Sequence, residues 1–131
     1  MVLDTNVFVA AYFNRRSASA RILDLCSKNE YELVISTRLS REVDSILKNI
    51  RAEGEFLEWL RGLFMRALQV KPTKRVFAIR EDPEDNKFLE CAQEGKADYL
   101  ITSDRHLLEL GEFAQTKICK PTRFLKLQCA W

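Results

Sequence analysis

Short apolar runs alternate with helical segments along this chain, and the alternation limits the folds open to it. Strand-like runs are expected at residues 1–3, 33–35, 97–102 and 116–119, with 97–102 the clearest of the four. Helical patterns are expected at residues 7–13, 18–27, 39–50, 55–68, 86–95 and 104–110, with a closing helical turn at 121–125. Residues 70–77 are ambiguous, because Pro72 splits a possible strand. Strands that alternate with helices predict an α/β fold, a three-layer α/β/α sandwich with a mainly parallel central sheet.

Length and composition fit one domain spanning residues 1–131, with 47% hydrophobic and 31% charged residues. The net charge of +2 is too small to indicate a nucleic-acid-binding protein by itself, although it allows a local basic surface. We expect no signal peptide, because the first strand begins within three residues of Met1, and no apolar stretch is long enough to span a membrane. A cytoplasmic protein without membrane contact is therefore predicted.

Metal sites built from cysteine and histidine are not indicated. The four cysteines are far apart in sequence, and His106 is the single histidine, so no zinc-binding set forms from neighbours. Cys26 and Cys91 lie among apolar residues at helical spacing and are expected to be buried. His106 is expected to be an exposed helical residue without a catalytic role.

Four acidic residues lie where apolar runs end or where helices begin: Asp4, Glu42, Asp85 and Asp104. Taken singly, each aspartate reads as a helix N-cap and the glutamate as a solvent-facing residue. Asp4 and Asp104 follow predicted strands, and parallel sheets form sites beyond the carboxyl ends of their strands. A cluster of carboxylates there would need a cation, which makes it a candidate Mg²⁺ or Mn²⁺ site for phosphodiester chemistry.

Three segments carry a resemblance to a known family. Residues 2–7 read VLDTNV, residues 81–92 read EDPEDNKFLECA, and residues 97–104 read ADYLITSD. In this order they resemble the PIN-domain family, most closely its VapC-like toxins of toxin–antitoxin pairs. The resemblance implies a metal-dependent endoribonuclease that cleaves single-stranded RNA, is bound by a cognate antitoxin protein and forms a homodimer.

The resemblance also implies roles for individual residues. It assigns Mg²⁺ or Mn²⁺ binding and catalysis to the same four acids, and a supporting role to Asn6 and Thr102. Asp44 is a rival for Glu42, whose segment has no fixed motif. Asp82 is a rival for Asp85, but Asp85 directly precedes the apolar helix face and fits better.

Substrate and partner surfaces are indicated less directly. Five arginines fall near the predicted acidic edge and are candidates for RNA phosphate binding: Arg15, Arg16, Arg21, Arg41 and Arg105. Residues 56–64 carry many large apolar side chains, and any excess beyond one core-facing stripe would mark a dimer or antitoxin surface. Trp131, at the end of the chain, is a further candidate for such a surface.

Three other functions remain open from the sequence. The chain could be a PIN-like RNA-binding or regulatory module without turnover, although four repelling carboxylates argue against a retired site. It could instead be a housekeeping RNA-processing nuclease. A phosphatase or receiver domain is disfavoured, because residues 4–6 lack the second aspartate of an Asp-x-Asp pattern and no lysine follows the strand at 97–102.

Overall fold

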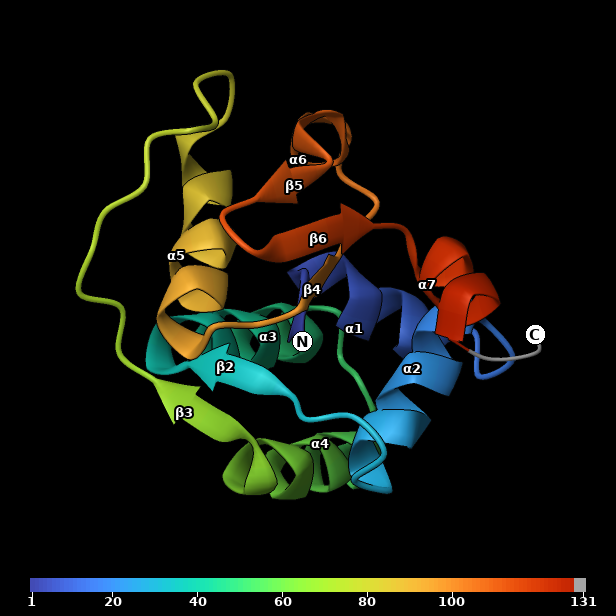
Figure 1. Ribbon diagram of the computed structural model, residues 1–131. Helices are drawn as coiled ribbons and strands as arrows, with labels where there is room; N and C mark the ends of the chain where they lie inside the picture. The colour runs from blue at the N-terminus through green and yellow to red at the C-terminus, as the bar shows by residue number, and fades with distance from the viewer. Residues whose placement is uncertain (129–131) are drawn as a thin grey trace.

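Short strands and helices alternate throughout residues 1–128, the part of the chain that the structure, a computed structural model, describes (Figure 1). The strands are β1 (Val2–Leu3), β2 (Val34–Ser36), β3 (Leu68–Val70), β4 (Tyr99–Ile101), β5 (Glu112–Phe113) and β6 (Thr116–Cys119). The helices are α1 (Thr5–Phe13), α2 (Ala18–Ser27), α3 (Thr37–Asn49), α4 (Gly54–Arg66), α5 (Asn86–Gly95), α6 (Arg105–Leu110) and α7 (Pro121–Gln128), with a 3₁₀ turn, η1 (Pro83–Asp85), before α5.

The central sheet is mainly parallel. Its four-stranded part has the order β1-β4-β6-β5, in which only the short β5 runs antiparallel to its neighbour. β2 and β3 form a parallel pair, and the Val34 N–H joins this pair to β1 by donating to the Met1 carbonyl at 2.8 Å. Helices flank the strands, so the predicted three-layer α/β/α fold is confirmed.

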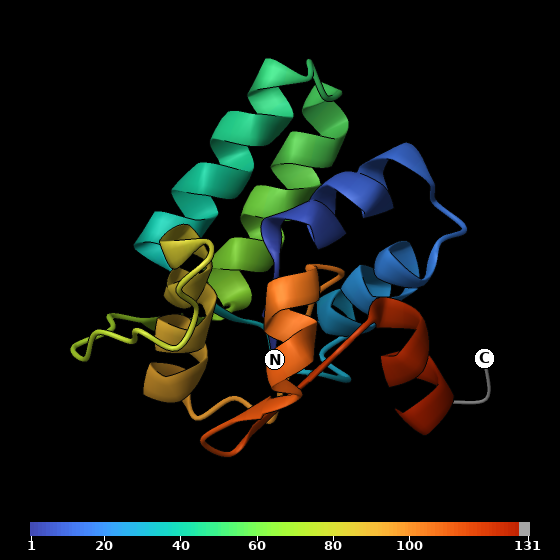
Figure 2. The same ribbon diagram turned by 90° about the horizontal axis from the view of Figure 1, so that it is seen from above.

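The core lies between the sheet and the helices that cover it. α5 packs across β1, β2, β3 and β4, while α1, α2 and α7 pack against one another. α3 and α4 lie side by side as a helical pair (Figure 2). The expected burial of Cys26 and Cys91 is confirmed, since both side chains lie in the core. Within residues 1–128, no helix has the length and apolar character needed to cross a membrane.

Strand β3 and hairpin strand β5 were not expected from the sequence. The helix predicted at 55–68 ends at Arg66, and β3 follows it as an edge strand whose residues are exposed or half-buried. Such a strand shows no buried apolar pattern, because only its pairing with β2 defines it. Residues 71–82 then have no regular secondary structure. Trp131 lies outside the described residues.

The end of α5 also differs from the expectation. Gly95 was expected to act as the C-cap, but it is the last helical residue, and Lys96 takes the left-handed conformation with φ 51°. Glycine at position 95 is explained by packing, because an added Cβ would clash with the side chain of Val34 on β2. The glycine therefore allows α5 to approach the sheet closely.

Candidate metal centre

Asp4 and Asp104 lie side by side at the carboxyl edge of the sheet. Each follows one of two paired parallel strands, β1 and β4, and the Asp4 N–H donates to the Ile101 carbonyl at 3.0 Å. Both also cap helices. Oδ1 of Asp4 accepts from the Asn6 N–H at 3.2 Å, and Oδ1 of Asp104 accepts from the His106 N–H at 2.9 Å. Capping and site formation are therefore compatible, because capping occupies one oxygen of each carboxylate.

Thr102 connects these two acids. Its side chain is fully buried, and its hydroxyl donates to Oδ2 of Asp4 at 2.6 Å. The same hydroxyl oxygen accepts from the Asp104 N–H at 2.9 Å. Asn6 was also expected to support the site, but its contact with Asp4 is made by the backbone N–H, and its side chain is exposed.

Asp85 carries the least compensated charge of the site. It lies at the junction of η1 and α5 and is only 9% exposed, and its Oδ2 is the one buried side-chain oxygen or nitrogen within residues 1–128 that has no hydrogen-bond partner. Burial, followed by the charges of Asp104, Asp82 and Asp4, raises the pKa of Asp85 to about 6. Its rival Asp82 is exposed, which favours Asp85 as the residue that faces the site.

Asp85 and Asp104 come together with His106. One ligand atom from each lies within 4.8 Å of the other two, a spacing that a single metal ion can bridge. Two carboxylates, one of them with an unpartnered buried oxygen, fit a hard divalent cation, and an imidazole is compatible with Mn²⁺. His106 was expected to be exposed and without a role; it is half-buried and belongs to this group. Its position two residues after Asp104 was the available signal.

Glu42 approaches the site through a lysine. Its carboxylate lies 2.7 Å from Lys87 Nζ on α5 and 3.5 Å from Arg38 Nε. Its rival Asp44 instead pairs with Lys48 at 2.8 Å and with Arg61 of α4 at 3.5 Å. Of the two, Glu42 is therefore the one turned toward α5, although it lies outside the three-residue group.

Lys87 is a cation of the site that the sequence did not indicate. Its side chain is 15% exposed, and besides Glu42 it reaches Glu84 at 3.9 Å. Burial raises the pKa of Asp4, and the Thr102 hydrogen bond and the charge of Lys87 oppose that effect. Lys87 thus partly offsets the repulsion among the acids in the absence of a metal.

Comparison with known proteins identifies the family. A PIN-domain profile matches residues 1–106. This chain belongs to the PIN-domain family. PIN domains are generally metal-dependent nucleases that typically use divalent metals and act on RNA, and the acidic cluster of this PIN domain lies within the matched segment.

One curated relative extends the likeness beyond the matched segment. An uncharacterised protein of Methanocaldococcus jannaschii is 29% identical over 118 residues, which cover 86% of this chain and 75% of that protein. No solved structure matches the chain significantly. The chemistry of this PIN domain is therefore argued from its family and from the geometry of its own acidic residues.

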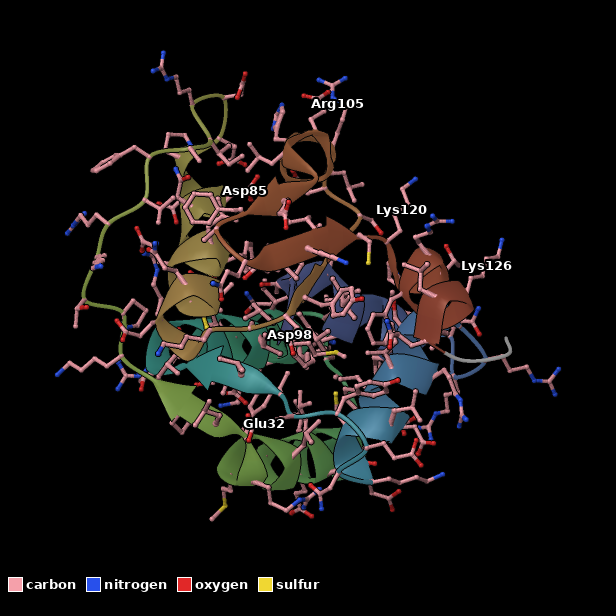
Figure 3. The ribbon with its side chains drawn as sticks, in the orientation of Figure 1. Glu32, Asp85, Asp98, Arg105, Lys120 and Lys126 are labelled. Atoms are coloured by element: carbon pink, nitrogen blue, oxygen red, sulfur yellow. The ribbon has the colours of Figure 1, made fainter. Side chains whose placement is uncertain are left out.

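Two of the arginines expected to bind phosphates lie beside the acids of this PIN domain. Arg105 directly follows Asp104 and is exposed, and Arg41 is exposed on α3 next to Glu42. Figure 3 shows Arg105 at the same end of the molecule as Asp85. Both arginines are thus placed to contact a substrate that reaches the acids.

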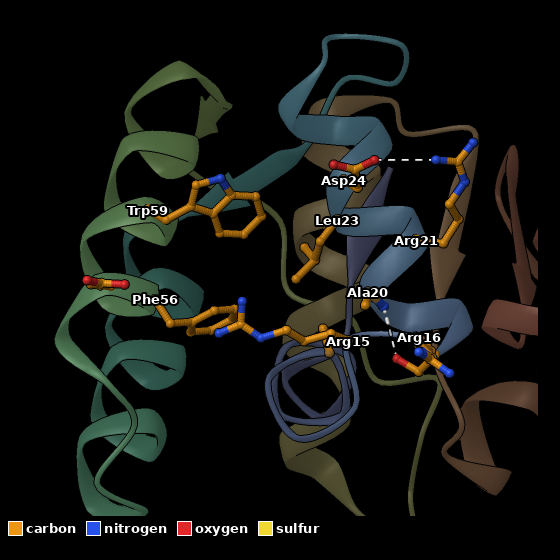
Figure 4. Close-up of a pocket in the computed structure, with 11 residues that line it drawn as sticks. Arg15, Arg16, Ala20, Arg21, Leu23, Asp24, Phe56 and Trp59 are labelled. Atoms are coloured by element: carbon orange, nitrogen blue, oxygen red, sulfur yellow. Dashed lines mark hydrogen bonds and ion pairs between the residues drawn. The ribbon is translucent and has the colours of Figure 1, made fainter.

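The other arginines expected at the acidic edge lie elsewhere. Asp4 caps the first turn of α1, whereas Arg15 and Arg16 follow its last turn, about 14 Å away along the helix axis. A separate cavity of about 630 Å³ is lined by residues that include Arg15, Arg16 and Arg21. Figure 4 shows Phe56 and Trp59 of α4 extending into this cavity. Closeness in sequence to Asp4 was misleading, because α1 carries these arginines away from the sheet edge.

Proposed function

We propose that this PIN domain is a Mg²⁺- or Mn²⁺-dependent endoribonuclease that cleaves single-stranded RNA. The observation that carries the proposal is the buried, unpartnered Oδ2 of Asp85, which lies in a group with Asp104 and His106. An oxygen of this kind is costly unless a cation or a proton compensates it. A nuclease that binds a divalent metal has a use for it, whereas a purely structural carboxylate does not.

The residues of the chain have distinct roles in this proposal. Asp85 and Asp104, with His106, would hold the metal, while Thr102 fixes the orientation of Asp4 beside them. When bound, a divalent metal polarises a phosphoryl oxygen and lowers the pKa of a coordinated water. Glu42 is a further acid at the edge of the site, reached through Lys87. The Lys87 ammonium is placed to stabilise negative charge on the phosphate that is cleaved.

Substitution of the acids tests the proposal directly. We expect Asp104→Asn and Asp4→Asn to abolish metal-dependent cleavage of a labelled single-stranded RNA while circular dichroism shows a folded protein. Asp98→Asn is the matched control, because Asp98 is exposed and precedes β4, whereas Asp104 follows it. EDTA should stop cleavage by the wild-type protein, and Mn²⁺ or Mg²⁺ should restore it. Undiminished cleavage by both site variants would sink the proposal.

A regulatory module without turnover predicts different behaviour. The proposed enzyme binds Mn²⁺ in isothermal titration, and Asp85→Asn weakens that binding strongly. A module whose site is retired would bind no Mn²⁺ and would cleave no RNA under any metal condition. The unpartnered oxygen of Asp85 favours the enzyme, because a site without a cation gains nothing from burying that charge.

The role proposed for the nuclease is that of the toxin in a toxin–antitoxin pair, acting as a cytoplasmic homodimer. The VapC-like motifs support it, and so does α4, where Trp59 is 41% exposed and Met65 is 86% exposed, beyond the stripe buried in the core. Induced expression should arrest growth, expression of Asp104→Asn should not, and a small antitoxin gene should adjoin this one. A housekeeping nuclease would cause no arrest that depends on Asp104.

A further inference from the structure

The loop between β3 and η1 carries a concentrated positive charge. Residues 71–80 contain four cations, Lys71, Lys74, Arg75 and Arg80, and no acidic residue. All four are exposed, and none of them forms an ion pair with another residue in the described part of the chain. By contrast, Arg38 and Lys87, on the neighbouring elements, are both paired with glutamates. The loop cations are therefore available to an anionic ligand.

The loop is held in place although it has no regular secondary structure. Three side chains of α5, one helical turn apart, bind it at three-residue intervals. Oε1 of Glu94 accepts from both the N–H and the hydroxyl of Thr73 at 2.9 Å. Oε2 of Glu90 accepts from the Val76 N–H at 3.0 Å.

The third attachment is the buried Asn86, the first residue of α5. Its side chain exchanges two hydrogen bonds with the backbone of Ile79, at 2.9 and 2.8 Å. Val76 and Ile79 are themselves buried, so apolar contacts add to the attachment. The loop therefore runs along α5, from its C-terminal end toward Asp85 and the acidic group (Figure 1).

Phe77 lies between these buried attachments and is 77% exposed. The aromatic contacts found within residues 1–128 involve other rings, so Phe77 stacks on no protein ring. With Lys71, Lys74 and Arg75 it lines a groove of about 890 Å³, whose wall on the α5 side includes Lys87. A fixed aromatic ring among unpaired cations matches single-stranded nucleic acid, since the bases stack on rings and the phosphates attract cations.

We infer that Phe77 is a base-stacking residue for single-stranded RNA and that Lys71, Lys74 and Arg75 bind the phosphates beside it. Resting on the proposed nuclease function, this places a substrate subsite in the β3–η1 loop, outside the group of metal-binding acids. The groove continues past Lys87, which pairs with Glu42 at the edge of the site. A strand bound on the loop would thus be led toward the scissile position. Phe77 acts here as a positioning residue and touches no reacting atom.

Binding without cleavage tests the inference. Anisotropy of a fluorescein-labelled oligouridylate in EDTA reports affinity alone. We expect Phe77→Ala to raise Kd about tenfold, as the loss of one base stack does, and Phe77→Trp to leave Kd within about twofold of wild type. Phe13→Ala is the matched control, because Phe13 is 68% exposed but lies at the end of α1, and its Kd should be unchanged. Both aromatic side chains project into solvent, so neither truncation should unfold the protein.

Two further arms separate stacking from charge. Phe77→Ala should leave binding of duplex RNA unchanged, because paired bases are unavailable for stacking. Lys74→Ala with Arg75→Ala should reduce the slope of log K against log salt by about 1.4, that is ~0.7 for each phosphate released. A Kd for Phe77→Ala within twofold of wild type, an equal loss in Phe13→Ala, or an equal loss on duplex RNA would each overturn the inference.

The inference and the proposed function fail separately. If the oligouridylate binds in a Phe77-dependent manner but no metal supports cleavage, the subsite stands and the nuclease function does not. If cleavage depends on Asp104 while Phe77→Ala changes neither Kd nor KM, the nuclease stands and the subsite does not. With the subsite in place, Phe77→Ala raises KM for the single strand and changes kcat little.

Discussion

The hydroxyl of Thr102 donates a hydrogen bond of 2.6 Å to Oδ2 of Asp4, across two strands that are almost a hundred residues apart in sequence. The same hydroxyl receives the backbone N–H of Asp104. One buried side chain thereby sets the position of both strand-end acids. Such support behind a metal-binding carboxylate commonly changes metal affinity by about 10- to 100-fold when it is removed.

Thr102→Val is therefore expected to weaken Mn²⁺ binding by at least about tenfold and to slow RNA cleavage to a similar degree. Valine has nearly the same shape but cannot donate to Asp4 or accept from the Asp104 N–H. Thr102→Ser keeps the hydroxyl and should restore most of both. Isothermal titration and single-turnover cleavage provide the measurements. Wild-type affinity in the valine variant would show that the hydrogen bond has no role in the site.

Asp85→Asn is expected to stabilise the metal-free protein at neutral pH. The pKa of Asp85 is raised from 3.8 in the unfolded chain to about 6 in the folded protein. A raised carboxyl pKa contributes stability that is complete below the unfolded value and is lost as the pH rises through the folded value. At pH 7.5 the charged Asp85 is thus a burden that asparagine removes, a gain on the order of 1 kcal/mol after allowance for solvent screening.

The gain should shrink as the pH falls from about 6 toward 4, where the wild-type carboxyl is protonated in the folded state. Urea unfolding in EDTA across this range measures it, with the exposed Asp82→Asn as control. Saturating Mn²⁺ should reverse the order, because it stabilises only a protein that binds it. A metal-free Asp85→Asn protein less stable than wild type at pH 7.5 would contradict the electrostatic account.

Lys87→Met should slow cleavage by at least about tenfold while leaving Mn²⁺ affinity equal to or higher than that of wild type. The substitution retains the apolar stem but removes the cation that lies 2.7 Å from Glu42. The acids then repel one another more strongly, which favours metal binding. Lys48→Met, which removes a comparable ion pair to Asp44 on the exposed face of α3, is the control. Equal losses of affinity and rate would instead indicate a structural role for Lys87.

Gly95→Ala should destabilise the fold by about 1–3 kcal/mol, because the added methyl group enters the contact between α5 and Val34 of β2. Gly54→Ala, at the first position of α4, meets no atom within 4 Å and should change stability by no more than about 0.5 kcal/mol. Urea denaturation compares the two variants. Equal stability would show that α5 can move away from the sheet at little cost.

The parts of the fold that depend on local pattern agree with the sequence-based expectation. β1 and β4 are short apolar runs, followed by Asp4 and Asp104 respectively, so their position and the edge they share could be predicted. β5 consists of two residues defined only by pairing with β6, and β3 is an exposed edge strand. Neither has a periodicity of its own, because tertiary pairing creates them.

The candidate site divides in the same way. The strand ends brought Asp4 and Asp104 together as expected, and burial separates Asp85 from Asp82. Lys87 and His106 depend on how α5 and α6 are rotated against the sheet, which no motif reports. Ion pairing distinguishes Glu42 from Asp44, and that required the position of α5 relative to α3.

The attachment of the β3–η1 loop to α5 has an evolutionary consequence. Three loop residues advance for each helical turn, so Thr73, Val76 and Ile79 match Glu94, Glu90 and Asn86 in step. A single inserted or deleted residue between 73 and 79 would break this match, as a slip does between paired strands. Length variation among relatives should therefore be absent from this stretch and fall in the turn at 80–82. A segment classified as irregular would then be conserved in length as strictly as a strand.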